Sequence, residues 1–207
     1  MGAGEIPLLD ITGTTLGDLA IRLVNVKEIG KFSFSSVAVS SLIIPDSVIK
    51  IDEGAFYRSD LETIALPAWL NIIETGVFAG CADLTTVILP EDIITIKNSA
   101  FEGCKSLTSI TLPNRLKYLG KNVFHDCTSL TNINIPDRVT LIDEATFKNS
   151  GLTSIVIPNK VTSIGDEAFN GCKDLNGEYF LLLHSFLKLL IVSIHRSLLQ
   201  GLFKFFL

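Results

Sequence analysis

The chain has 207 residues, of which 47% are hydrophobic and 19% are charged, and its formal net charge at pH 7 is −5. This hydrophobic content is enough to bury a core and excludes intrinsic disorder for most of the length. Because 17 basic residues stand against 22 acidic ones, the chain lacks the clustered positive charge that binding to nucleic acid requires, and nucleic acid is excluded as a partner.

The N-terminal segment, residues 1–36, is predicted to form a degenerate repeat that caps the fold. Its first residues, MGAGEIPLLDITG, have neither the basic start nor the uninterrupted apolar run of a secretory signal. With no signal peptide visible, the chain as it stands is expected to be cytoplasmic. Residues from about 16 to 36 carry a weak form of the repeat that follows. Phe34 occupies the aromatic position but the proline is missing, as is typical of a terminal repeat.

Residues 37–174 contain six repeats of 22 or 23 residues. Each repeat has one proline: Pro45, Pro67, Pro90, Pro113, Pro136 and Pro158. A phenylalanine follows eleven residues after each proline: Phe56, Phe78, Phe101, Phe124, Phe147 and Phe169. The proline and the phenylalanine keep the same separation in all six units, which indicates a repeat architecture. In such an architecture each unit must stack on its neighbours to bury its apolar face.

The repeat that begins LTSITLP shows how one unit is expected to fold. Ile110 and Leu112 alternate with two polar residues, which is typical of a short strand with one buried face. Pro113 ends this strand because proline cannot donate to the ladder. The next segment is predicted to be a short strand, a 3₁₀ turn or a single helical turn that forms a second inner wall. Turns with positive φ are expected at three glycines: Gly80, Gly103 and Gly171.

The run L-x-x-I-x-L-P, followed by I-x-x-x-A-F-x-G-C, resembles the BspA-like class of leucine-rich repeat, which is found in surface proteins of bacteria and in anaerobic protists. The resemblance and the unit pattern together predict a leucine-rich-repeat solenoid of the α/β class. Its parallel sheet is expected to be concave, with short turns or helical turns on the other side and a ladder of phenylalanines inside. The resemblance also implies a cell-surface location and a role in adhesion or surface display.

The cysteines occupy one position of the repeat: Cys81, Cys104, Cys127 and Cys172. Serine takes this place in the other two units, as Ser59 and Ser150. A position that accepts either residue needs a small, semi-buried side chain, so we expect packing thiols and neither disulfides nor zinc ligands.

Other residues that could carry chemistry also have simpler structural explanations. His125 stands at a position of varied side chains and is expected to be exposed. Acidic pairs such as Asp52 and Glu53 are interpreted as solvated turn carboxylates, with weak calcium binding as the alternative. No catalytic, cofactor-binding or metal-binding residues are therefore predicted, and the protein is not expected to be an enzyme.

The outward positions of the predicted concave sheet are the candidates for partner binding, since repeat proteins of this kind most often bind there. These candidates are Ser41, Ile43, Thr63, Thr86, Ile88, Ser109, Thr111, Asn132, Asn134, Ser154 and Val156. Trp69, two residues after Pro67, is expected to be exposed at a corner and is the best single contact candidate. The predicted function is a non-catalytic interaction scaffold that binds a protein or glycan partner.

The C-terminal segment, residues 175–207, differs in composition from the repeats. Of residues 179–207, 19 of 29 are apolar, ten of them leucine and five phenylalanine. Lys188, Arg196 and Lys204 interrupt the run, which makes a simple transmembrane helix doubtful. A helix over most of 179–200 is predicted, as a cap on the solenoid, in a dimer, in a membrane interface or as a non-native extension. The alternative function is a membrane-associated repeat protein anchored through 179–207.

Overall fold

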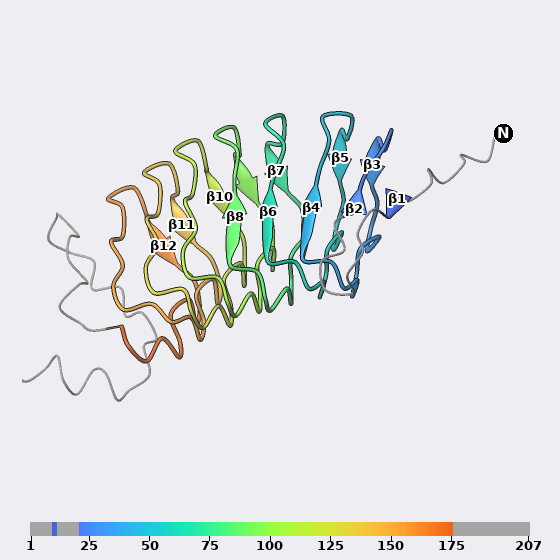
Figure 1. The fold of residues 1–207 in the computed structure, drawn as a ribbon. Coiled ribbons are helices and arrows are strands. Elements are labelled where there is room, and N and C mark those ends of the chain that lie inside the picture. The colour runs from blue at the N-terminus through green and yellow to red at the C-terminus, as the bar shows by residue number, and fades with distance from the viewer. Residues whose placement is uncertain (1–9, 12–20, 176–207) are drawn as a thin grey trace, which may run out of the picture.

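The computed structural model describes residues 10–11 and 21–175. Over residues 21–175 the chain coils into a solenoid in which each turn corresponds to one repeat of the sequence (Figure 1). One side carries a five-stranded sheet of β1 (Asp10–Ile11), β2 (Ile21–Arg22), β4 (Ser41–Ile43), β6 (Thr63–Ala65) and β8 (Thr86–Ile88). β1 is antiparallel to β2, and the other neighbours are parallel. The predicted leucine-rich-repeat solenoid with a parallel sheet is confirmed.

A second set of two-residue strands forms the other wall of the coil. These strands are β3 (Glu28–Ile29), β5 (Lys50–Ile51), β7 (Ile72–Ile73), β9 (Thr95–Ile96), β10 (Tyr118–Leu119), β11 (Leu141–Ile142) and β12 (Ser163–Ile164). They pair in parallel as β3 with β5, β7 with β9, β9 with β10, and β11 with β12. Of the three conformations considered for this segment, the structure adopts the short strand.

The described residues contain no helix, so the α/β class and the helical turns are corrected to an all-β solenoid with tight turns. The tight turns around the phenylalanines are closed by main-chain hydrogen bonds from the N–H of residue i+3 to the carbonyl of residue i. One example is the bond from the Tyr57 N–H to the Gly54 carbonyl at 2.9 Å. No helix able to cross a membrane occurs in the described ranges. The predicted C-terminal helix of 179–200 lies outside them.

Left-handed residues explain why these turns do not become helical. Positive φ is confirmed at the three predicted glycines, Gly80, Gly103 and Gly171, with values of 77°, 72° and 78°. The structure adds a second left-handed residue two positions before each phenylalanine, for example Gly76 at 61° and Ser99 at 57°. Two left-handed residues four positions apart interrupt the right-handed backbone that a helix requires.

The phenylalanines form the predicted ladder inside the coil. From Phe56 to Phe169, consecutive rings lie 5.4 to 5.7 Å apart between centroids, with their planes within 10° of parallel. Phe34 adds one more rung, 5.5 Å from Phe56, so the N-terminal segment stacks on the array. Phe34 is half-buried, whereas the five rings from Phe56 to Phe147 are completely buried. Offset stacking and burial make these five rings large contributors to the core.

The turns that carry these phenylalanines form one edge of the solenoid, which we call the turn edge. Main-chain bonds link its units: the Phe78 N–H donates to the Ala100 carbonyl at 2.9 Å, and the Phe124 N–H to the Thr146 carbonyl at 2.8 Å. Each turn is therefore fixed by the next unit as well as by its own bonds, and side chains at equivalent positions lie in columns along the edge.

Candidate functional site

Apart from Trp69, the predicted binding residues lie together on one surface, which we call the sheet face. It consists of the outward positions of β4, β6, β8 and the equivalent segments of later units. Ser41 is paired with Thr63, Thr63 with Thr86, and Asn134 is bridged to Val156. The sheet-face residues named in the sequence analysis are exposed, except Ser154, which is half-buried. The parallel register therefore places side chains 22 or 23 positions apart in the sequence beside one another.

A hollow of about 390 Å³ opens on the sheet face, where regular strand pairing ends after β8. Five of the predicted residues line it: Thr86, Ile88, Ser109, Thr111 and Asn134. Glu91 and Asn114, which the sequence analysis did not single out, also line it. The hollow combines hydroxyl, amide and carboxylate groups with one aliphatic wall, a combination suited to a polar ligand with an apolar part.

An apolar strip runs from this hollow across three neighbouring strands. Ile43 is 78% exposed and Ile88 is 61% exposed. Ala65, which is paired with Ile88, lies between them and is also exposed. Single exposed aliphatic side chains are common, but three in adjacent strands form a continuous surface that a partner can cover.

Trp69 lies at the corner after Pro67 and is 38% exposed. Its exposure agrees with the sequence analysis, but it is not among the residues that line the sheet-face hollow. The structure therefore does not bring Trp69 together with the other candidates in this cavity.

The four cysteines are free, buried thiols. Each Sγ donates to the carbonyl of the phenylalanine in the preceding unit, as from Cys104 to Phe78 at 3.2 Å and from Cys127 to Phe101 at 3.1 Å. Burial raises the pKa of all four thiols above the ordinary value, most strongly for Cys104 and Cys127. A thiol that stays protonated is a poor nucleophile, so these groups act as packing elements.

His125 is less exposed than predicted, with 22% of its side chain accessible. Its Nδ1 lies 3.4 Å from a carboxylate oxygen of Glu102, and its Nε2 lies 3.5 Å from one of Asp126. In the acidic pair Asp52 and Glu53, the Asp52 carboxylate accepts a hydrogen bond from the Glu53 N–H at 2.9 Å. Its other oxygen lies 2.9 Å from Nζ of Lys50. No cluster of three or more potential metal ligands occurs in the described part of the chain.

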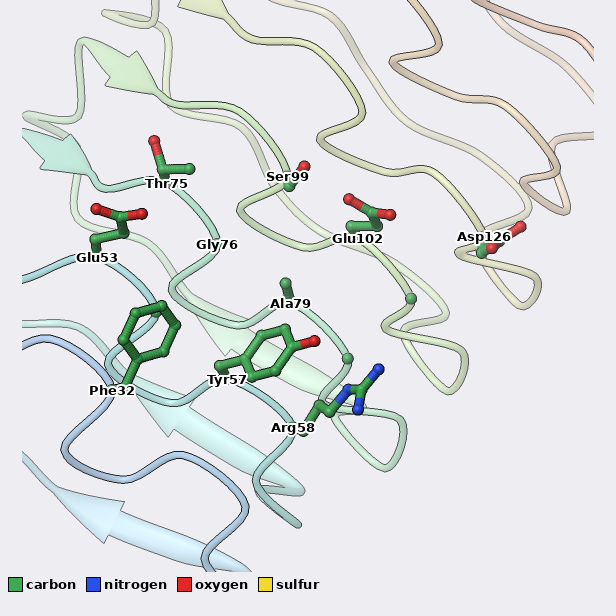
Figure 2. Close-up of a pocket in the computed structure, with 13 residues that line it drawn as sticks. Phe32, Glu53, Tyr57, Arg58, Thr75, Gly76, Ala79, Ser99, Glu102 and Asp126 are labelled. Carbon is green, nitrogen blue, oxygen red and sulfur yellow. The ribbon is translucent and has the colours of Figure 1, made fainter.

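A second hollow, of about 350 Å³, opens on the turn edge and was not anticipated from the sequence (Figure 2). Its walls include Tyr57 and Arg58 on one side and Glu102 on the other, with Gly76 and Ala79 between them. The sequence carried a signal for it, because one unit has Ala79 at a position where its neighbours have Tyr57 and Glu102. It becomes visible only when the columns are read across units.

Comparison with known proteins agrees with this architecture. The family described as BspA type leucine rich repeat region matches residues 14–99 and 51–176, with six copies. A leucine rich cell surface protein from Faecalibacterium prausnitzii A2-165 has a similar structure, with a TM-score of 0.70 and 27% identity over 84% of this chain and 55% of that one. The chain thus spans little more than half of that protein.

A leucine rich repeat protein from T. pallidum is also similar, with a TM-score of 0.54 and 26% identity over 83% of this chain and 89% of that one. No curated protein matches the chain. The similarities therefore concern the repeat fold, and one of the similar proteins is described as a cell surface protein.

Proposed function

Because the chain belongs to the BspA type leucine-rich repeat family, we propose that it is a non-catalytic interaction scaffold that binds a protein or glycan partner through its sheet face. The observation that carries the proposal is the sheet-face hollow, where Ile88, Thr111 and Asn134 meet beside the apolar strip. A rigid repeat array offers this surface without the ordering cost that a flexible surface incurs on binding.

The absence of catalysis in this proposal rests on the surroundings of the cysteines and of His125 within the described residues. The cysteine thiols are buried and donate to main-chain carbonyls. His125 lies between two carboxylates, and no activated nucleophile lies beside it in the part of the chain that the structure describes. These groups are arranged for packing and surface charge, whereas nucleophilic catalysis needs a nucleophile and a base in hydrogen-bond contact.

A cell-surface location with a role in adhesion is part of the same proposal. It is supported by the similar cell surface protein from Faecalibacterium prausnitzii. An adhesive scaffold would use the solenoid to display the sheet face to extracellular matrix proteins or to glycans.

Binding to immobilised fibronectin, collagen and a glycan array tests the proposal. We expect at least one of these probes to retain the protein, and the substitution Ile88→Glu to weaken that binding at least about tenfold because it puts a charge on the apolar strip. The matched control is Ile49→Glu, the same change at an isoleucine that is 66% exposed but lies outside the sheet face.

Three results would contradict the proposal: no retention by any probe, equal binding by the Ile88→Glu variant, or loss of binding in the control alone. Thermal unfolding of both variants checks that each retains the fold, since substitutions at exposed positions usually change stability little.

A further inference from the structure

The sheet-face hollow lies where the main-chain ladder of the sheet is interrupted. β8 is the last strand of the five-stranded sheet (Figure 1), and the Leu66 N–H still donates to its Ile88 carbonyl at 3.0 Å. The equivalent segment of the next unit, residues 109–112, is not a strand and forms no main-chain hydrogen bond with β8. Pairing resumes at Asn134, which is bridged to Val156. The ladder is therefore missing between the same three units that line the hollow.

The interruption leaves main-chain groups of two buried residues without a partner. In β8 the main-chain groups of Thr86 and Ile88 point towards β6, so those of Val87 point to the opposite edge, where the next unit lies. Within the described residues, neither Val87 nor Ile110, its equivalent in the next unit, has a main-chain hydrogen bond at this edge. Both residues are 7% exposed, and both line the hollow. Buried main-chain groups are almost always paired, so the hollow is the side from which a polar partner can reach them.

Packing elsewhere keeps these three units at the spacing of single strands. The rings of Phe78, Phe101 and Phe124 are stacked at 5.4 and 5.7 Å between centroids, and β9 pairs directly with β10. A peptide strand inserted between two units would need them to lie about 9.5 Å apart, twice the ordinary strand spacing. The main-chain groups are therefore best bridged by a single atom that both donates and accepts. A hydroxyl oxygen does this, whereas an amide carries its donor and its acceptor on different atoms.

The side chains around the hollow suit a ligand with several hydroxyl groups. Thr111, Asn114 and Asn134 offer one hydroxyl and two amide groups, and an amide can bond two neighbouring hydroxyls because it has two polar atoms. Ile88, which is 61% exposed, offers an aliphatic surface to the C–H groups of a sugar ring. Among the described residues that line the hollow, Glu91 carries the only charge. A phosphate, sulfate or carboxylate group would meet repulsion there and no cation.

We propose that the sheet-face hollow binds a neutral sugar ring of a glycan. One ring hydroxyl lies between the free main-chain groups of Val87 and those of the next unit, neighbouring hydroxyls bond Thr111 and Asn134, and the C–H face of the ring lies on Ile88. The volume of about 390 Å³ falls within the range of small-ligand sites, about 300 to 1,000 Å³. This inference rests on the proposed function, because it assigns the glycan among the partners considered for the same surface.

Amide hydrogen exchange tests the interruption of the ladder before any ligand is added. Ile64 is the matched reference, because it occupies the equivalent position in β6 and is paired with β8. The Val87 amide should exchange at least about tenfold faster than the Ile64 amide, since it has no main-chain bond to break. Equal protection of the two amides would show that Val87 is paired and would overturn the proposal.

The methyl glycosides of glucose, galactose and mannose are the probes, and ¹⁵N-resolved NMR of the whole chain is the measurement. We expect at least one glycoside to shift the amide signals of Val87 and Thr111, with a Kd of about 1 mM, as for a single weakly held ring. Tetrahydropyran-2-methanol, which keeps the ring without its hydroxyl groups, should bind at least about tenfold more weakly. Absence of shifts for all three glycosides up to about 50 mM, or equal binding of this control compound, would overturn the proposal.

Two variants and one matched control test the geometry. Asn134→Ala and Thr111→Val, which each remove polar atoms from the hollow, should weaken binding of the glycoside at least about fivefold. Asn71→Ala makes the same change at an exposed asparagine next to β7, outside the sheet face, and should leave binding unchanged. Unchanged binding in both hollow variants would contradict the site. Retention by fibronectin or collagen without any response to the glycosides would overturn this inference alone and leave the proposed function standing.

Discussion

Replacing Phe101 by alanine is expected to lower the free energy of unfolding by about 3 to 5 kcal/mol. Phe101 is fully buried and stacks on Phe78 and Phe124, at 5.4 and 5.7 Å between centroids. The substitution removes the ring from both contacts and leaves a cavity in the middle of the ladder. Chemical denaturation followed by circular dichroism measures the loss.

The control is Phe32→Ala, the same chemical change at a ring that is 51% exposed. Because Phe32 lies at the turn edge with half of its surface in water, its loss should cost about 1 kcal/mol. Equal losses for the two variants would contradict the assignment of the phenylalanine ladder to the core.

Stability is expected to fall steeply above pH 8.5, the ordinary pKa of a thiol. Burial raises the pKa of Cys81, Cys104, Cys127 and Cys172 in the folded chain. The unfolded chain therefore releases thiol protons first, which favours unfolding as the pH rises. The stability that the buried thiols contribute is fully present below the unfolded pKa. It is lost as the pH rises from the unfolded towards the folded pKa, with a limiting slope of about 1.4 kcal/mol per thiol and pH unit. Cys104 and Cys127, whose pKa values are raised most, together give about 2 kcal/mol between pH 8.5 and 9.5, and Cys81 and Cys172 act in the same direction.

The comparison that isolates the thiols is a variant with all four cysteines changed to serine, which the repeat already accepts at Ser59 and Ser150. Denaturation at pH 7.5, 8.5 and 9.5 in the presence of a reductant should show the steep fall in the parent chain only. Parallel pH profiles for the two proteins would contradict thiol burial as the cause, because lysine and tyrosine titrations are common to both.

The repeat made most of the fold predictable from the sequence. Alternation around Ile110 and the corner at Pro113 predicted strands, and the register of the phenylalanines predicted the stacked ladder. The common position of Cys104 and Ser150 predicted small buried side chains. Each of these inferences is strong because the same physical requirement acts on every unit, so one ambiguous residue is corrected by five equivalent ones.

The turns were harder to predict because their conformation does not depend on local preference alone. Arg58 and Glu167 adopt positive φ, at 55° each, although neither residue type favours it. At Arg58 the N–H donates to the carbonyl of Ala79 in the next unit, at 2.8 Å. Bonds between units thus hold backbone conformations that the sequence of one unit would not indicate, and helical turns were expected in their place.

The candidate site was predictable as a surface but not as cavities. Sheet-face residues follow from the alternation of side chains along a strand, so Thr86 and Thr111 could be named in advance. Neither hollow could be predicted from the sequence, because each depends on the relative size of side chains in adjacent units. Ala79 marks a hollow only beside Tyr57 and Glu102, which are 22 and 23 positions away.

Contacts between consecutive phenylalanine rings test the stacking of the repeats most directly, because the sheet face and the turn edge both depend on the register in which the repeats stack. Nuclear Overhauser effects from selectively labelled phenylalanine rings should connect Phe78 with Phe101 and Phe101 with Phe124, whose centroids are 5.4 and 5.7 Å apart. No effect should connect Phe78 with Phe124, which are separated by a whole unit. Effects between these two rings, or none between neighbours, would contradict the stacked register on which the proposed sites depend.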